Sequence, residues 1–394
     1  MEIWIILAIL FTILVAFLLT LYILYKLKTK SQGKEPAAYD QKIVRDYSVQ
    51  WEIDQRDQKR MQQRPGGKQT GSLGLRNKQL DCFMNATLQC FLGMDEFCEG
   101  VLKEVINNDC SDDEAKSDED LICKGRVLYE FKKFIEEYKA RRLSAESTKP
   151  LREVFETLFP SHQQHDARQF IMELFEAIQS EKNSSNQQFI SSGQKNHKEA
   201  WEEYRKVSSS IIDDFFIGMY ETIIECQGCH TKVSVYEQFN HVPLPVTLNN
   251  SFKSFESFLS DFGQEYYSQF KCKECNDLKE SSLIRKIVKY PKCIIFTFER
   301  LNPGNNTKIS EFQDFPQSFV LPDPEKDQED PGKLKFTLNS IVNHFGTLRN
   351  GHYTANSLRD NQWYKFDDEF AGCLSNKLVK SNEAYILFYK TESY

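Results

Sequence analysis

The stretch GLRNKQLDCFMNATLQCFL, residues 74–92, decides the fold; it begins polar and becomes apolar at helical spacing. The apolar positions start at Phe83, so a helix is expected to begin at or just after Cys82. Unpaired amides and the dipole at a helix N-terminus favour a thiolate over a thiol. Asn77 lies five residues upstream and can present a side-chain amide where a developing oxyanion needs a donor. A lone cysteine before an apolar helix is more often a small buried residue, so partners elsewhere must decide.

Composition describes a mostly soluble globule in a reducing compartment. The chain has 394 residues, with 27% charged and 40% hydrophobic residues. Its net charge of −7, from 50 basic and 57 acidic residues, argues against nucleic acid as a partner. The 11 cysteines are odd in number and scattered, which does not suggest a disulfide scaffold.

The N-terminal segment has the composition of a membrane anchor. Residues 3–25 form an apolar run long enough to cross a bilayer, which takes about 20 residues as a helix. Lysines follow the run directly, so the positive-inside bias puts the rest of the chain in the cytosol. A cleaved signal peptide is the alternative, but Glu2 and the length of the run oppose it. We expect a single-span anchor over residues 1–25, in the mitochondrial outer membrane or the endoplasmic reticulum. A juxtamembrane linker is expected over residues 26–70.

The remaining chain, residues 71–394, shows helices first and strands afterwards, which predicts an α+β domain. Helical spacing occurs at residues 82–107, 121–141, 151–159 and 161–178, and the polar segment 183–199 is expected to be a loop. Alternating or short apolar runs predict strands at residues 215–226, 233–239, 283–288, 293–298, 334–345, 353–358, 363–366 and 384–389.

Two cysteine pairs have the spacing of zinc knuckles. Cys226 and Cys229 form the first pair, and Cys272 and Cys275 form the second. Four thiolates satisfy tetrahedral Zn²⁺ with no open position, so this metal would be structural. Two unrelated surface pairs are the alternative, and a redox role is disfavoured because no thioredoxin-like pattern surrounds either pair.

A histidine and an aspartate near the C-terminus complete a possible catalytic set. His352 follows Gly351, which is expected to allow a sharp turn into the strand, and Asp367 lies on the next strand. Adjacent antiparallel strands can bring the carboxylate to one imidazole nitrogen and leave the other for a thiol. A cysteine nucleophile, a histidine base and an aspartate orienter form the generalised triad. The alternative is a structural histidine beside an exposed Asp-Asp turn.

Several motifs together resemble the ubiquitin-specific protease family of papain-like cysteine proteases. Residues 74–90 resemble that family's cysteine box, and QQHDARQF at residues 163–170 resembles its glutamine box. YPKCIIFTFERL at residues 290–301 resembles the strand that leads to the histidine box. NHFG and NGHY within residues 343–353, with WYKFDD at residues 363–368, match the histidine box itself. The motifs occur in family order across about 320 residues, so their joint specificity is high.

The resemblance implies a right-hand architecture and a deubiquitinating reaction. A helical thumb would span roughly residues 71–201, fingers would carry the zinc, and a palm would hold the histidine and aspartate. Ubiquitin and ubiquitinated proteins would be the partners. By motif position, the resemblance implies the following roles: Cys82 is the nucleophile, His352 the base, Asp367 the orienter and Asn77 the oxyanion donor, while Gln164 and Asp166 lie near the ubiquitin tail.

The chain departs from the family pattern beside the nucleophile. Gln79 stands where the family has a small glycine, which predicts a strained or reshaped loop. Asp81 puts a negative charge next to Cys82, which disfavours the thiolate, and Asn350 replaces a glycine before Gly351. Since no catalytic atom is lost, we expect activity. The alternatives are an inactive ubiquitin-binding scaffold of the same fold, a protease for another ubiquitin-like modifier, and a purely structural zinc protein.

Overall fold

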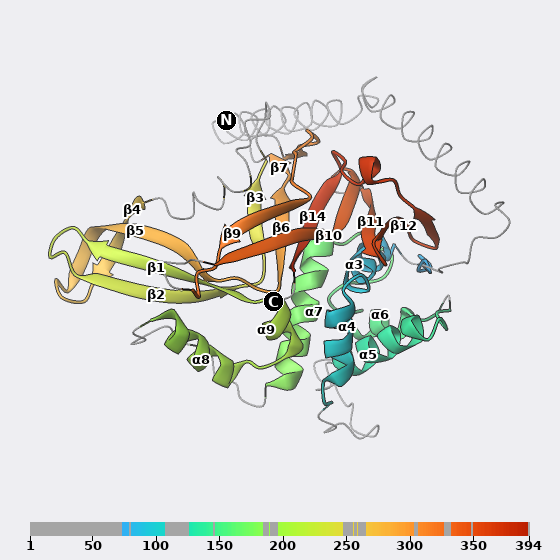
Figure 1. The fold of residues 1–394 in the computed structure, drawn as a ribbon, viewed down its shortest axis with the longest axis horizontal. Coiled ribbons are helices and arrows are strands. Elements are labelled where there is room, and N and C mark those ends of the chain that lie inside the picture. Colours follow the sequence, from blue (N-terminus) through green and yellow to red (C-terminus); the bar gives the residue numbers. More distant parts are fainter. Residues whose placement is uncertain are drawn as a thin grey trace, which may run out of the picture. The chain divides into compact units, whose positions relative to one another are not determined.

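The computed structural model describes most of the chain after residue 72, and the ribbon is shown in Figure 1. The described residues are 73–78, 80–106, 126–144, 146–183, 189, 196–246, 255, 258, 265–302, 306–326, 332–347 and 350–392. The expected anchor at residues 1–25 and linker at residues 26–70 lie outside them. Among the described helices, none is both long enough and apolar enough to cross a bilayer.

Helices form the first half of the described chain. They are α3 (Cys82–Phe91), α4 (Asp95–Lys103), α5 (Arg126–Lys139), α6 (Lys149–Val154), α7 (Ala167–Lys182), α8 (His197–Val207) and α9 (Ile211–Phe215). Helix α3 is apolar on nearly every side, and all ten of its residues are buried. Helix α7 is amphipathic and is capped by Asp166, whose side chain accepts from the Gln169 amide.

An eight-stranded sheet receives α3 on one face. Its order is β13-β12-β11-β10-β14-β6-β3, with β9 also paired to β10, and only the β3–β6 pair is parallel. The strands are β3 (Val242–Pro245), β6 (Cys293–Glu299), β9 (Ser318–Pro322), β10 (Lys333–Gly346), β11 (Gly351–Arg359), β12 (Gln362–Asp367), β13 (Phe370–Cys373) and β14 (Ala384–Thr391). Short elements β7 (Leu301–Asn302), β8 (Thr307–Lys308) and η1 (Asn376–Leu378) lie between them in the sequence.

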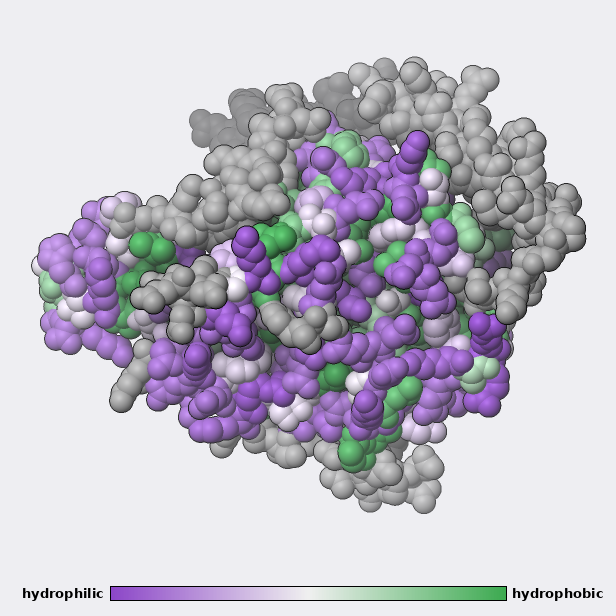
Figure 2. All heavy atoms as spheres, in the orientation of Figure 1, coloured by the Kyte–Doolittle hydropathy of each residue, from purple (hydrophilic) through white to green (hydrophobic). Residues whose placement is uncertain are grey.

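A second, antiparallel sheet of four strands has the order β2-β1-β5-β4. Its strands are β1 (Gly218–Cys226), β2 (Lys232–Phe239), β4 (Glu265–Cys272) and β5 (Asp277–Lys289). In Figure 1 these long strands run side by side to the left of the eight-stranded sheet. Hydrophilic residues dominate the face shown in Figure 2, and hydrophobic residues there form only small patches. Large apolar side chains exposed on the four-stranded sheet are Val233, Tyr266, Tyr267, Phe270 and Leu278.

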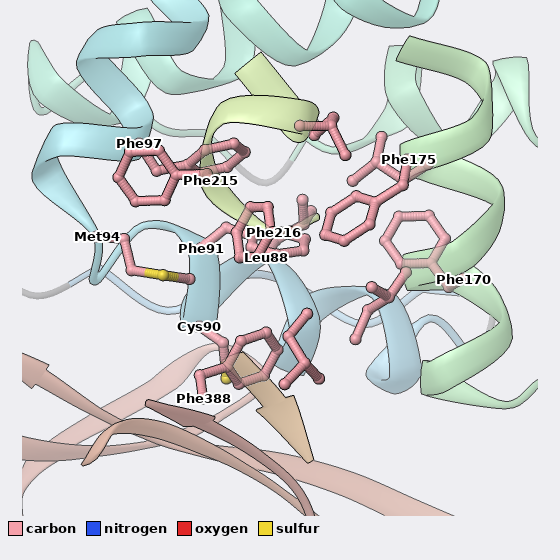
Figure 3. Packing of buried hydrophobic residues seen from close by; sticks show 14 of the residues in the cluster. Leu88, Cys90, Phe91, Met94, Phe97, Phe170, Phe175, Phe215, Phe216 and Phe388 are labelled. Carbon is pink, nitrogen blue, oxygen red and sulfur yellow. The ribbon is translucent and has the colours of Figure 1, made fainter. Parts of the chain in front are cut away.

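Two apolar clusters bury both faces of the eight-stranded sheet. Along β6, Cys293 and Ile295 belong to one cluster, whereas Ile294 and Phe296 belong to the other. This alternation follows from the two-residue period of a strand, and it explains why β6 is apolar throughout. The cluster shared with the helices centres on Phe91, which packs against five other aromatic rings: Phe97, Phe131, Phe175, Phe216 and Phe388. Figure 3 shows Cys90 and Phe388 beside the sheet, with Phe97 and Phe215 toward the helices.

The expected α+β class is confirmed, but some element boundaries are wrong. The helical segments expected over residues 82–107 are α3 and α4, which are separated at residues 92–94. Gly93 lies there against β11, so closely that a Cβ would come within 2.3 Å of the Arg359 guanidinium and 2.4 Å of the Ser357 hydroxyl. Helix α8 begins at His197, inside the last residues of the loop expected over 183–199, and Asn196 caps it by accepting from the Glu199 amide. The strand expected from residue 215 begins at Gly218, because α9 precedes it.

Candidate active site

The N-terminus of α3 delivers Cys82 to the sheet. Helix α3 packs on β10, β11 and β12 and on α7, and Cys82 is only 5% exposed. The first turn closes with the Asn85 amide donating to the Asp81 carbonyl at 2.9 Å. Asp81 occupies the N-cap position, but its side chain makes no capping hydrogen bond. The thiol therefore stands at a helix N-terminus, as the apolar pattern predicts.

Strands β11 and β12 bring a histidine and a carboxylate to the same point. His352 is the second residue of β11, and Asp367 is the last residue of β12. The His352 Nε2 atom lies 2.7 Å from Asp367 Oδ1. The Cys82 side chain lies close enough to the His352 ring to help raise its pKa. The structure thus brings Cys82, His352 and Asp367 together, although 270 residues separate the first two in the sequence.

Charge in this cluster favours the protonated imidazole. Burial lowers the pKa of His352, but the hydrogen bonds and charges of Asp367 and Cys82 outweigh it and raise the pKa to about 10. Burial raises the pKa of Asp367, but the hydrogen bond and charge of His352 outweigh it and hold that pKa below its usual value. His352 can therefore hold a proton beside the sulfur at neutral pH, which suits it to receive and return one.

Asn77 lies beside these residues, and both polar atoms of its side-chain amide are hydrogen-bonded. Its Nδ2 atom donates to Asp368 Oδ2 at 2.9 Å, and its Oδ1 atom accepts from the Asp81 amide at 2.9 Å. Asp368 also accepts from Asn85 Nδ2 at 2.9 Å, so one carboxylate holds two asparagines. In the sequence Asp368 belongs to the WYKFDD motif, with an exposed turn as the alternative, and neither reading predicts this role. Its adoption of positive φ, 50°, after β12 is typical of a short polar residue, but the sequence alone does not show where it points.

The two residues expected near a substrate tail lie beside the histidine strand. Gln164 forms a pair of hydrogen bonds with the Gly351 backbone, at 2.8 Å to its carbonyl and 2.5 Å from its amide. Asp166 accepts from the Tyr385 hydroxyl at 2.8 Å while it caps α7. Neither contact joins these residues directly to Cys82.

Gly351 is needed for close packing and not for the expected sharp turn. A Cβ at this position would come within 2.1 Å of the His344 ring. Among the described residues between β10 and β11, the positive φ belongs to Gly346, at 95°, which is the last residue of β10. Burial, with nearby Lys308, lowers the pKa of His344 to about 4, so this ring is neutral against the Gly351 backbone.

The structure describes three of the four residues between Asn77 and the nucleophile. The Asp81 carboxylate forms a buried salt bridge with Arg152, at 2.8 Å between Oδ1 and Nε. Lys78 pairs with Glu146 at the surface. Gln79 lies outside the described residues, but Leu80 next to it has a φ of 65°, in the left-handed region that a branched side chain rarely adopts. Backbone strain therefore falls at Leu80.

The four knuckle cysteines meet at the far end of the four-stranded sheet. Their sulfur atoms all lie within 4.8 Å of one another; Cys226 and Cys275 are 3.9 Å apart, and Cys229 and Cys272 are 3.5 Å apart. Zinc–sulfur bonds of about 2.3 Å in a tetrahedron put sulfurs about 3.8 Å apart, so the set fits Zn²⁺. In each knuckle a backbone amide also points at the first sulfur, from Gly228 and Cys275, both at 3.4 Å.

A cysteine on a helix N-terminus, with a histidine and an aspartate supplied by an adjoining sheet, is the constellation of a cysteine hydrolase. The family model described as "Ubiquitin carboxyl-terminal hydrolase" matches residues 73–389, which is most of the chain. The chain belongs to the ubiquitin carboxyl-terminal hydrolase family.

Relatives agree with this assignment. The chain is 25% identical to ubiquitin carboxyl-terminal hydrolase Usp2 of Drosophila melanogaster and to ubiquitin carboxyl-terminal hydrolase 2 of Homo sapiens. Each match covers 82% of this chain, but only 35% of the fly protein and 56% of the human one. The chain therefore spans a third to little more than half the length of these two relatives.

Solved structures share the fold. The SAGA Ubp8/Sgf11/Sus1/Sgf73 DUB module bound to ubiquitin aldehyde matches with a TM-score of 0.62 at 22% identity, over 82% of this chain and 70% of that one. The same module with a Ubp8 variant, bound to monoubiquitin, matches with a TM-score of 0.61 at 21% identity, over 82% and 69%.

Replacing Leu80 with asparagine is expected to stabilise the protein. A left-handed backbone costs a branched residue roughly 1–2 kcal/mol, and asparagine tolerates it better. Because Leu80 is 40% exposed, little packing is lost. We expect the free energy of unfolding to rise by about 0.5–1 kcal/mol in guanidinium titrations. Leu158→Asn is the matched control, since Leu158 is 42% exposed and is absent from the positive-φ residues. If Leu80→Asn lowers the free energy of unfolding as much as Leu158→Asn does, the backbone at Leu80 is not strained.

Proposed function

We propose that this protein is a thiol-dependent deubiquitinase that hydrolyses the bond after the C-terminal glycine of ubiquitin. The observation that carries the proposal is the contact of Cys82 with His352, which is itself held by Asp367. The family assignment supports the same chemistry, and two structures that share the fold contain ubiquitin or ubiquitin aldehyde.

The proposed reaction follows the usual path of a thiol hydrolase. His352 takes the proton of Cys82, and the thiolate attacks the glycine carbonyl to form a tetrahedral intermediate. Collapse of the intermediate breaks the bond to the lysine amine, which leaves with the proton from His352. Water then gives a proton to His352 and attacks the thioester, after which the proton returns to the Cys82 sulfur. Asp367 keeps the imidazole oriented and stabilises its charge in both halves.

Asn77 is proposed as the donor to the oxyanion, together with a backbone amide near Cys82. A side-chain amide has two N–H groups, and one of those on Asn77 donates to Asp368. That bond orients the amide so that the second N–H can serve the oxyanion without reorganisation. Asp368 would thus act through Asn77, as Asp367 acts through His352.

Ubiquitin is proposed to rest on the two sheets, with its tail leading to Cys82. In the hand description, the helices from α3 to α7 form the thumb, the eight-stranded sheet the palm and the four-stranded sheet the fingers. The exposed aromatic side chains of the fingers, such as Tyr267 at 59% exposure, offer apolar area for a protein partner. Gln164 and Asp166 flank the strand that presents His352, which suits a role in guiding the tail.

Hydrolysis of a fluorogenic amide of ubiquitin tests the activity. We expect the whole chain to release the fluorophore and Cys82→Ala to lose at least about 10³-fold in rate, since alanine at this position cannot form the thioester. Cys373→Ala is the matched control, because Cys373 is exposed and lies away from the cluster on β13. Ubiquitin binding without hydrolysis would instead support a catalytically inactive scaffold.

Asp367→Asn is expected to move the alkaline limb of the pH–rate profile. The carboxylate helps raise the pKa of His352 to about 10, and the leaving amine needs the protonated imidazole. Without that charge the imidazole loses its proton at lower pH, so the alkaline limb of kcat/KM should fall by at least about one pH unit. Asp314→Asn, at an exposed carboxylate paired with Lys380, should leave the limb in place. An unmoved limb in Asp367→Asn would refute the proposed pairing.

The four knuckle cysteines are proposed to hold a structural Zn²⁺. The metal would join the β1–β2 turn to the β4–β5 turn, and these turns have few buried side chains to hold them otherwise. We expect one zinc per chain by elemental analysis, lost in Cys272→Ser and retained in Cys373→Ser. A zinc-free protein with four reduced knuckle thiols, or full zinc in Cys272→Ser, would contradict the proposal.

A membrane anchor at residues 1–25 is proposed on the apolar run alone. The lysines that follow it support a cytosolic catalytic domain, on the endoplasmic reticulum or the mitochondrial outer membrane. A fusion of residues 1–40 to a fluorescent protein should collect on one of these membranes and resist carbonate extraction. A diffuse or carbonate-extractable fusion would remove the anchor from the proposal.

A further inference from the structure

Asp81 introduces a buried negative charge directly before the nucleophile. The residue is 5% exposed, and its carboxylate does not cap the helix that it precedes. Charges interact strongly where water is excluded, so a carboxylate at this place disfavours a thiolate on the next residue. The site therefore needs a counter-charge if Cys82 is to ionise readily.

Arg152 supplies a positive charge at this carboxylate from a distant part of the chain. It lies in α6, its side chain is 6% exposed, and its Nε atom donates to Asp81 Oδ1 at 2.8 Å. The same guanidinium lies 3.1 Å from Glu156 Oε2 and donates to the Ser161 hydroxyl at 3.4 Å. The Glu156 side chain is 48% exposed, so water screens its charge, whereas Asp81 relies on Arg152.

The other ionisable groups around Cys82 have partners of their own. His352 on β11 pairs with Asp367 on β12, and Asp368 accepts from two asparagines. Burial, with the charge of Asp166 second, raises the pKa of Tyr353, so that hydroxyl stays neutral. Removal of Arg152 would consequently leave one additional carboxylate without a cation, on the residue directly before Cys82.

We propose that Arg152 is a positioning residue for the nucleophile: by neutralising Asp81 at the N-terminus of α3, it keeps the Cys82 thiolate accessible at neutral pH. This inference deepens the proposed function, on which its catalytic meaning rests. Arg152 also fixes the Asp81 side chain, and the Asp81 backbone amide donates to Asn77. The ion pair therefore helps to hold Asn77, the proposed oxyanion donor, through Asp81.

The pH dependence of Cys82 alkylation by iodoacetamide tests the ion pair without any ubiquitin. The Cys82 peptide is quantified by mass spectrometry in the whole chain, and the pH of half-maximal rate is compared between variants. We expect Arg152→Gln to raise this midpoint by about one pH unit, and Asp81→Asn with Arg152→Gln to return it close to that of the wild type. Arg285→Gln, which removes an arginine paired with Glu237 on the four-stranded sheet, should leave it unchanged.

Asp81→Asn alone provides a second, independent arm if Arg152→Gln fails to fold. It leaves the Arg152 charge without its buried partner near the sulfur, so the alkylation midpoint should fall below that of the wild type. If Arg152 has only a structural role, the alkylation midpoint should not shift in either single variant, or its shift should persist in the double variant. Either result would overturn the proposal. Because the readout uses no ubiquitin, a protein that shows the shifts but does not hydrolyse ubiquitin amides would refute only the proposed function.

Discussion

Helix α3 is buried on every side, between the other helices and the eight-stranded sheet, and the position of the site depends on that burial. Its residues contact β10, β11 and β12 on one side and α7 on the other. Phe91 is surrounded by aromatic rings, and interiors packed to this density do not allow a helix to slide or rotate freely. Cys82 is consequently fixed relative to the strand that carries His352, and the thiol and the imidazole meet without either residue being held by a loop alone.

The second constraint is electrostatic. Three carboxylates belong to the site, those of Asp81, Asp367 and Asp368, and each has a different kind of partner: a guanidinium, an imidazole and a pair of amides. Desolvated carboxylates of this kind destabilise an anion nearby unless they are paired. The site thus remains compatible with a nucleophilic sulfur because the fold assigns every one of these negative charges a donor, including the one at position 81 where the chain departs from its family.

Much of this could be predicted from the sequence, because the chemistry sits in short segments. The apolar run after Cys82, the paired cysteines, and the histidine and aspartate on consecutive strands each follow from local spacing, and the structure brings each set together. What could not be predicted depends on contacts between distant segments. Gly93 packs closely against Arg359, and the Asp81 charge is compensated from α6. The sequence did not predict α8, because most of its residues are polar and only a few apolar ones face β1.

The identity of the reacting sulfur decides whether the proposed chemistry is right. Ubiquitin that carries a C-terminal electrophile traps the nucleophile of a thiol hydrolase as a covalent adduct, which peptide mapping assigns to one cysteine. We predict a single adduct on Cys82 of the whole chain, blocked by prior alkylation of that residue. An adduct on any other cysteine, or none on a folded protein that binds ubiquitin, would contradict the central claim.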